Sequence, residues 1–174
     1  DAYGRALAML GRSLPPDRPE LAGARQSLGG VRGETGDFAR AKSLFERAIT
    51  IKSKAYGPDD AEVALARVGY ARVLRATADF GRARDENERA LKALERALGS
   101  DHLLVAEPLI GLAGLNKDAG ELALARTQAE RALAVRERAL GPDHVQVAEA
   151  LDGLALIVKA MGDPPAARQK LERA

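Results

Sequence analysis

The chain has 174 residues, with 27 lysine and arginine side chains against 25 aspartate and glutamate, no cysteine and no tryptophan. The missing cysteines exclude disulfides and thiolate metal sites, and the balanced charge is spread along the chain rather than clustered as nucleic-acid binding requires. The sequence has no run of about 18 apolar residues and no basic-then-apolar leader, which excludes a membrane-spanning segment. We therefore expect a cytoplasmic protein, and abundant alanine and leucine with only 3% aromatic residues favour a helical one.

Two short motifs recur along the chain at a fixed spacing. Gly57-Pro58-Asp59 returns 42 residues later as Gly99-Ser100-Asp101 and again as Gly141-Pro142-Asp143. Glu-Arg-Ala keeps the same spacing at Glu46, Glu88, Glu130 and Glu172. A fixed period of about 20 to 50 residues is typical of stacked supersecondary units, which bury their apolar faces only against their neighbours. The period predicts a single stack, with a partial second helix at 1–14, repeats at 15–56, 57–98 and 99–140, and a truncated repeat at 141–174.

Each repeat contains two helical patterns, here named helix A and helix B. Apolar residues that share one helical face predict helix A of the last repeat: Val147, Leu151, Leu154, Ala155 and Val158. The same criterion predicts helix B of the preceding repeat from Leu122, Ala125, Ala129, Ala132 and Leu133. The sequence therefore predicts an all-α protein. Both ends of the chain fall inside helix B patterns, so we expect it to be an excerpt of a longer protein.

Turn residues mark where the predicted helices begin and end. Aspartates with a suitable partner three residues later predict the N-caps of helix A: Asp17 with Glu20, Asp59 with Glu62, and Asp143 with Gln146. Tight turns between A and B are predicted at Gly36, Ala78, Gly120 and Gly162, and Pro164 is placed to open the last helix. Pro108 falls inside the third helix A. Because an internal proline removes a backbone hydrogen bond, that helix should bend or begin late.

The order of small and apolar residues resembles the tetratricopeptide repeat family. The residues that carry the resemblance are Leu28-Gly29, Gly36, Phe38, Ala41, Phe45 and Ala48, with Leu112-Ala113, Gly120, Leu122, Ala125 and Ala132 as later equivalents. The usual repeat has about 34 residues. The longer period, with Gly-Pro-Asp-His before helix A and Glu-Arg-Ala-Leu in helix B, is similar to the kinesin light chain subclass, whose bacterial relatives occur in multidomain signalling proteins. The resemblance implies a right-handed superhelix, an α-solenoid of antiparallel helix pairs, in which helix A lines a concave face that binds peptides.

The chain departs from kinesin light chains at one pair of positions on helix A. Kinesin light chains tend to carry paired asparagines there, whereas this chain has Gln26-Ser27, Val68-Gly69, Ile110-Gly111 and Asp152-Gly153. Asparagine side chains can bind both the N–H and the C=O of an extended peptide. The resemblance therefore does not extend to cargo recognition of the kinesin type.

Small and charged residues on helix A are the candidates for a peptide groove. Glycines at one register would leave room for a ligand backbone: Gly69, Gly111 and Gly153. A basic row is predicted from Arg75, Lys117 and Lys159, with Arg72 and Asn116 beside it, and it would suit an acidic peptide. Acidic candidates are Glu107 and Glu149, which form a second row, and Asp152. The alternative is that acids near the start and bases near the end of a helix only complement its dipole.

The histidines and the repeated Glu-Arg pairs are the residues that could suggest a metal site or a catalytic site. His102 and His144 could suggest a metal site or a pH switch, but Arg18 and Asp60 stand at the equivalent positions and no third ligand is in sight. A structural role in the first helical turn is expected instead. Glu-Arg pairs recur in every repeat, which is typical of a salt-bridge row and not of a catalytic site. Gly29, Gly30 and Gly33 follow no strand, so they do not predict a phosphate loop.

The sequence predicts no catalytic, cofactor-binding or metal-binding residue, and hence no enzyme. The favoured function is a protein-interaction scaffold that binds a peptide or partner segment, acidic in character, within a larger bacterial signalling or assembly protein. One alternative is a self-association or regulatory arm that packs on a neighbouring domain, including end-to-end contacts through exposed apolar ends. A second alternative is weak nucleic-acid binding through the basic row, which the scarcity of aromatic residues disfavours.

Overall fold

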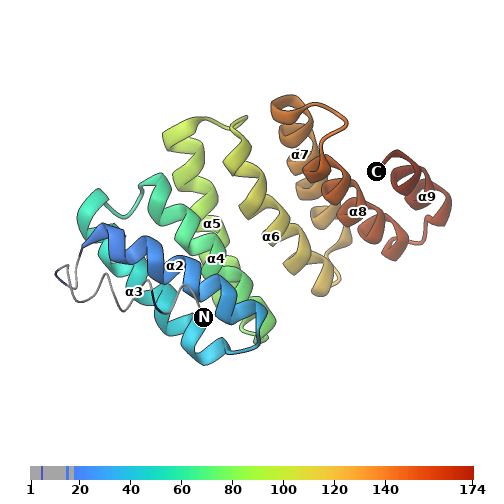
Figure 1. Ribbon diagram of the computed structural model, residues 1–174. Helices are drawn as coiled ribbons and strands as arrows, with labels where there is room; N and C mark the ends of the chain where they lie inside the picture. Colours follow the sequence, from blue (N-terminus) through green and yellow to red (C-terminus); the bar gives the residue numbers. More distant parts are fainter. Residues whose placement is uncertain (1–4, 6–14, 16–17) are drawn as a thin grey trace. The chain divides into compact units, whose positions relative to one another are not determined.

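The computed structural model describes Arg5, Pro15 and residues 18–174. The described residues form eight α-helices and one short 3-10 helix and contain no strand (Figure 1). The prediction of an all-α protein is therefore confirmed. The predicted partial helix at 1–14 lies outside the described residues, apart from Arg5. The chain divides into two compact units, residues 1–93 and 94–174, named unit 1 and unit 2.

The helices follow one another in pairs joined by short turns. Unit 1 contains α2 (Pro19–Glu34), α3 (Phe38–Tyr56), α4 (Ala61–Ala76) and most of α5 (Phe80–Leu98). Unit 2 contains the 3-10 helix η1 (Leu103–Val105), α6 (Ala106–Asp118), α7 (Leu122–Leu140), α8 (Val145–Ala160) and α9 (Pro164–Arg173). The A helices are α2, α4, α6 and α8, and the B helices are α3, α5, α7 and α9. In each unit one B helix packs against two A helices, α3 against α2 and α4, and α7 against α6 and α8. The two A helices of each set also contact each other.

Alanines on the B helices allow this close packing. Ala41, Ala83 and Ala125 occupy one register and are fully buried, as are Ala48, Ala90 and Ala132 seven residues later. Interiors are packed nearly as densely as organic crystals, so a larger side chain at either register would force the helices apart. The apolar face predicted for the last helix A is also confirmed, because all five of its residues are buried in α8.

Phe45 on α3 fills the space between α2 and α4. Its ring is 2% exposed, and it lies against Gly29 on α2 and Gly69 on α4. A Cβ atom added at Gly69 would lie 2.5 Å from Cε1 of Phe45, and one added at Gly29 would lie 3.0 Å from the same ring. The room that Gly69 leaves at its own Cβ position is therefore taken by an internal aromatic ring.

The turns between A and B helices are as predicted. Gly36, Gly120 and Gly162 adopt φ values of 82°, 80° and 85°, a region that L residues rarely adopt, and Ala78 at the equivalent turn has φ 58°. Helix α9 opens at Pro164, as predicted, after Asp163 accepts a hydrogen bond from the N–H of Ala166 at 3.0 Å.

The N-caps of helix A lie one residue later than predicted. The caps of α4, η1 and α8 are Asp60, His102 and His144, each of which accepts a hydrogen bond from the N–H two residues ahead. Before α4, the N–H of Asp60 donates to the C=O of Gly57, and this hydrogen bond closes a turn through Pro58 and Asp59. The extended backbone that a cap needs is therefore first available at Asp60. Asp17, the remaining predicted cap, lies outside the described residues.

Pro108 delays the start of the third helix A, as predicted. Helix α6 begins at Ala106 after the 3-10 turn η1 and has 13 residues, against 16 in α2, α4 and α8. Pro108 is the third residue of α6, where a backbone N–H has no intrahelical partner to lose. The proline is accommodated by the later start of the helix.

Tyr70 connects three successive helices of unit 1. Its hydroxyl donates to Glu46 on α3 and accepts from Nη2 of Arg82 on α5 at 2.7 Å, and the Arg82 guanidinium lies 5.5 Å from the Tyr70 ring centroid. The side chain is 2% exposed. Burial, and then the hydrogen bond to Glu46, raise the pKa of Tyr70 to about 12. No sequence motif singled out this network.

Gly69→Ala should destabilise the protein although alanine is the better helix former. The added methyl group overlaps the Phe45 ring, and overpacking of this kind costs about 1 to 3 kcal/mol. Gly153→Ala at the same register is the matched control. No atom lies within 4 Å of its Cβ position, so this variant should gain about 0.5 to 1 kcal/mol. Urea denaturation of both variants measures the difference, and equal stabilisation by the two would contradict the packing of Phe45.

Tyr70→Phe should reveal a stability contribution that disappears at high pH. Because the folded-state pKa is raised to about 12 from 10.0, the neutral phenol stabilises the fold below pH 10 and that contribution is lost as the pH rises toward 12. At pH 7 the variant should be less stable by about 1 kcal/mol.

Urea denaturation of the wild type and the variant between pH 7 and pH 12 measures this difference. Tyr56→Phe serves as the control, because Tyr56 is 51% exposed. A gap between wild type and Tyr70→Phe that stays constant over this range would count against the network.

Candidate functional site

Charged residues on the B helices are used to join neighbouring repeats. Arg131 on α7 binds Glu95 on α5 at 2.5 Å, and one period later Arg173 on α9 binds Glu137 on α7. Both arginines belong to the repeated Glu-Arg-Ala motif. For these two copies the interpretation of the motif as a salt-bridge row is therefore confirmed. The pair of Glu46 and Arg82, at 3.4 Å, joins α3 and α5 in a similar way.

The two residues of the predicted acidic row, Glu107 and Glu149, meet at a buried cation. Arg136 on α7 has a side chain only 6% exposed, and its Nη2 donates to Glu107 on α6 at 2.8 Å. Its Nη1 donates to the C=O of Gln146 at 2.6 Å and lies 3.6 Å from Glu149 on α8. Glu107 and Glu149 therefore act as counterions of Arg136, and the acidic row is part of the junction between α6, α7 and α8.

The same junction has a counterpart in unit 1, which the sequence interpretation missed. Lys52 lies two periods before Arg136, is 4% exposed, and donates from Nζ to Glu62 at 2.8 Å and to Gln26 at 2.7 Å. At the register between them stands Leu94, which is fully buried. The signal in the sequence was a cation on the apolar face of helix B in two repeats out of three.

The predicted basic row is divided between several environments. Arg75 is partly buried and makes an intramolecular contact, and Lys117 lies 3.4 Å from Asp118 with its side chain 34% exposed. Lys159 is exposed. All three stand in the last turn of their helices, where a cation also complements the helix dipole. Lys117 and Lys159 belong to unit 2 and Arg75 to unit 1.

Asn116 does not belong to an open groove. Its side chain is fully buried, and its Nδ2 donates to Gln128 on α7 at 2.6 Å. The placement of Asn116 beside a ligand is therefore corrected, because this amide joins α6 to α7. The sequence could not separate the two roles, since a polar residue near the end of helix A fits both.

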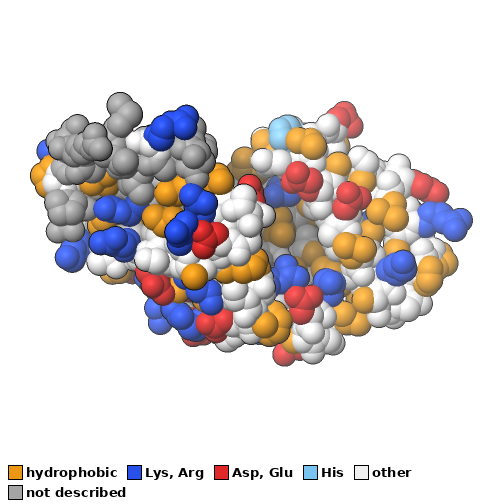
Figure 2. All heavy atoms as spheres, turned by 60° about the horizontal axis from the view of Figure 1, so that its bottom comes forward, with side chains coloured by type: hydrophobic (Ala, Val, Ile, Leu, Met, Phe, Trp, Pro, Cys, Tyr) orange, Lys and Arg blue, Asp and Glu red, His pale blue; other side chains and the backbone are white. Residues whose placement is uncertain are grey.

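The remaining predicted residues are accessible. Arg72 on α4 is exposed, as are Asp152 and Gly153 on α8, and Gly111 on α6 is partly buried. Within the part of the chain that the structure describes, no ion-pair partner is found for Arg72, Asp152 or Lys159. Figure 2 shows basic and acidic side chains interspersed among apolar ones on the displayed face, without one dominant basic area.

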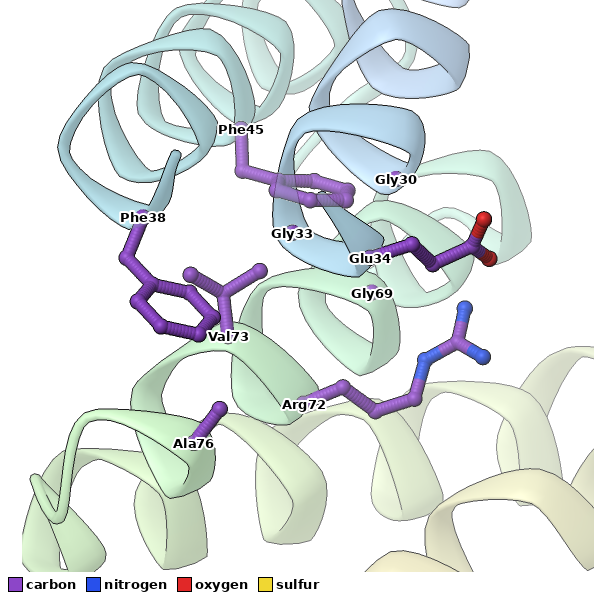
Figure 3. Close-up of a pocket in the computed structure, with 9 residues that line it drawn as sticks. All are labelled: Gly30, Gly33, Glu34, Phe38, Phe45, Gly69, Arg72, Val73 and Ala76. Atoms are coloured by element: carbon purple, nitrogen blue, oxygen red, sulfur yellow. The ribbon is translucent and has the colours of Figure 1, made fainter. Parts of the chain in front are cut away.

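A pocket of about 190 Å³ lies between the two A helices of unit 1 (Figure 3). Its lining consists of Gly30, Gly33 and Glu34 from α2, Phe38 and Phe45 from α3, and Gly69, Arg72, Val73 and Ala76 from α4. In Figure 3 the side chains of Glu34 and Arg72 reach toward one side, and Phe38, Val73 and Ala76 occupy the other. Two predicted residues, Gly69 and Arg72, line this pocket. The sequence interpretation did not identify the pocket.

The glycines of α2 explain why the surface is hollow at this place. Gly30 stands at the register occupied by Arg72, Gly114 and Leu156 in the later repeats, and Gly33 at that of Arg75, Lys117 and Lys159. At the register of Gly33, the first repeat therefore lacks the long side chain that the other repeats carry. No atom lies within 4 Å of a Cβ position on Gly30, whereas one on Gly33 would lie 3.2 Å from Cγ2 of Val73.

The described residues show neither the features of a metal site nor those of a membrane-spanning helix. They contain no group of three or more His, Asp or Glu side chains that could hold a metal ion. No helix among them is long and apolar enough to cross a membrane. His102 and His144 have the structural first-turn role expected for them, since each caps a helix through Nδ1.

Comparison with known proteins agrees with the repeat architecture. The family model described as tetratricopeptide repeat matches residues 20–96, 62–138 and 104–174. Among solved structures, BtubC (BKLC) from P. vanneervenii is similar with a TM-score of 0.81 and 24% identity, covering 98% of this chain and 68% of that one. Nearly identical TPR-like repeats assigned to a kinesin light chain of Podosopora anserina are similar with a TM-score of 0.74 and 19% identity, covering 98% and 81%.

The apo form of RapI gives a TM-score of 0.76 at 15% identity, covering 99% of this chain and 46% of that one. A comparison with curated protein sequences finds no match. At these identities the solved structures show a shared fold, and the sequence matches extend from residue 20 to residue 174. The chain therefore belongs to the tetratricopeptide repeat family.

Proposed function

We propose that the A helices bind an extended segment of a partner protein and that the pocket between α2 and α4 takes an apolar side chain of that segment. Tetratricopeptide repeat proteins are generally protein-interaction scaffolds and typically lack catalytic activity. The pocket is the observation that carries the proposal. It is formed by A helices, it has an apolar floor, and its volume exceeds the roughly 150 Å³ of a protein cavity that binds benzene.

Exposed charges on the A helices are available to a ligand, in addition to the pocket's apolar lining. Some charges on the B helices are engaged between repeats, as in the pairs Glu95–Arg131 and Glu137–Arg173, whereas others, such as Lys92, have no ion-pair partner among the described residues. On the A helices, the exposed Arg72, Asp152 and Lys159 lack an ion-pair partner among the described residues. Charged groups that are not used within the fold remain available for a ligand. Lys159 and Arg72 favour acidic groups on the ligand, which can form charge-assisted hydrogen bonds with them.

Self-association is the second candidate, and one observation favours it. Large apolar side chains on α8 and α9 of unit 2 are exposed: Val145, Leu156 and Leu171 by more than half, and Met161 at the end of α8 by 40%. Exposed apolar side chains of this size favour contact with another apolar surface. Nucleic-acid binding is less supported, because two residues of the proposed basic row are engaged within the fold: Lys117 lies 3.4 Å from Asp118, and Arg75 makes an intramolecular contact.

Gly30→Leu should abolish peptide binding at the pocket without weakening the fold. The leucine side chain would fill the pocket, and replacing a helical glycine without overlap should gain about 0.5 to 1 kcal/mol. Peptides selected from a random display library on the wild-type protein would be titrated by calorimetry against this variant. Their affinity should fall by about tenfold or more, equal to about 1.4 kcal/mol.

The control is Gly81→Leu on α5, where the added side chain likewise meets no atom within 4 Å of its Cβ position and lies outside the pocket. This variant should bind the selected peptides like the wild type. Unchanged affinity in Gly30→Leu would remove the pocket from the binding site, and failure to select any peptide would count against the scaffold function itself.

Lys159→Glu should weaken acidic peptides selectively. The substitution reverses an exposed charge on α8 that has no ion-pair partner among the described residues, so the fold should be unaffected within about 0.5 kcal/mol. Matched acidic and basic peptides would be compared by fluorescence anisotropy at low salt. Lys92→Glu, which reverses an exposed charge on the B helix α5, is the control. Equal loss in both variants would indicate a general charge effect and no recognition on helix A.

A further inference from the structure

The only two histidines of the chain occupy the same position in successive repeats of unit 2. His102 precedes η1, which leads into α6, and His144 precedes α8. Nδ1 of His102 accepts a hydrogen bond from the N–H of Leu104 at 3.3 Å, and Nδ1 of His144 accepts one from the N–H of Gln146 at 3.1 Å. A nitrogen that accepts a backbone N–H carries no proton of its own, so each of these caps requires the neutral imidazole with its proton on Nε2.

In unit 1 the equivalent N-cap residue is an aspartate. The equivalent residue before α4 is Asp60, whose carboxylate accepts the N–H of Glu62 at 2.8 Å. The A helix α2 begins after Arg18 and has no side-chain cap. The backbone geometry of the three capped starts is the same, with φ between −70° and −82° and ψ between 139° and 147°. The three capped helix starts therefore share a backbone conformation and differ in the side chain that accepts the hydrogen bond.

Protonation reverses the effect of a histidine cap. An imidazolium has N–H donors on both nitrogens, so Nδ1 would face a backbone N–H that it can no longer accept. The positive charge would also stand at the positive end of the helix dipole, where cations are unfavourable. Both effects act in the same direction, and both side chains are exposed to solvent protons.

Most of the carboxylates near the two histidines are already paired with arginines. Asp101, next to His102, is paired at 2.6 Å with Arg138 of α7, which packs against η1. Arg136 of α7 donates to the C=O of Gln146 in the turn that His144 caps, and it engages both Glu107 of α6 and Glu149 of α8. From α9, Arg173 is already paired with Glu137. Asp143, beside His144, is the acid that remains without an ion-pair partner among the described residues.

We infer that His102 and His144 form a pH-sensitive device that uncaps the A helices of unit 2 in mildly acidic conditions and leaves the Asp60 cap of unit 1 intact. Histidine is the side chain that ordinarily changes its charge between about pH 5 and pH 8. The protein should therefore hold its full stability above that range and lose part of it as the pH falls. The loss concentrates at the starts of η1–α6 and α8, which belong to the face proposed to bind a partner.

The test compares the wild type with a double variant, His102→Asn with His144→Asn, by urea denaturation between pH 8 and pH 5.5. Asparagine is a strong N-cap that does not titrate, and the double variant contains no histidine. Between these pH values the folding equilibrium constant of the wild type should fall roughly tenfold more than that of the variant. Equal pH dependence of the two proteins overturns the inference.

A second measurement needs no variant. In an NMR titration of the wild-type chain, the backbone N–H signals of Leu104 and Gln146 should move with the titration curves of His102 and His144, because each N–H loses its acceptor. The N–H signal of Glu62, capped by Asp60, should stay unchanged down to pH 5.5. Leu104 and Gln146 signals that do not move while the imidazoles titrate would overturn the inference as well.

Discussion

The structure depends on how closely an A helix can approach the B helix on which it packs. A single helix pair cannot bury its apolar face alone, so its stability comes from contacts with the next pair. Alanines repeated at two registers of the B helices keep those contacts short, and six of them are fully buried at positions 41, 48, 83, 90, 125 and 132. Where an A helix carries glycine at the contact, as at Gly29 and Gly69, a ring as large as that of Phe45 fits between two A helices.

The contacts between helices determine which charged side chains are engaged within the fold. The B helices approach one another through ion pairs such as Glu137–Arg173, and the cations Lys52 and Arg136 are buried where B helices meet the starts of A helices. These groups are used within the fold. Exposed charges on the A helices, such as Arg72 and Lys159, have no ion-pair partner among the described residues, and the pocket between α2 and α4 is what assigns the proposed ligand surface to helix A.

The repeats share a backbone conformation but carry different kinds of side chain at single registers. One register holds Lys52, Leu94 and Arg136, which shows that the same junction can be charged or apolar. A second holds Asp60, His102 and His144, which cap their helices in the same geometry with different responses to acid. A repeat tolerates such exchanges because each position contacts only the adjacent units, so the effect of a change stays local.

Much of this protein follows from sequence alone. The period of 42 residues, the helical patterns and the turn residues determined an all-α tetratricopeptide architecture, and Pro108 determined the late start of the third A helix. These features are local, since hydrogen bonding within a helix and the φ values of a turn depend on neighbouring residues. Even so, the caps were assigned one residue early, because the Gly57–Asp60 turn shifts the first extended residue.

Tertiary structure decided what each side chain contacts. Several residues have the type and spacing of groove residues but contact other helices instead. Gly69 packs against Phe45, and Asn116 donates a hydrogen bond to Gln128. Glu107 and Glu149 both pair with Arg136. Each of these partners lies on another helix. A periodic sequence fixes which residues share a register on one helix, but the register does not state which side chain of the next helix arrives opposite, because that depends on how the helices pack in three dimensions.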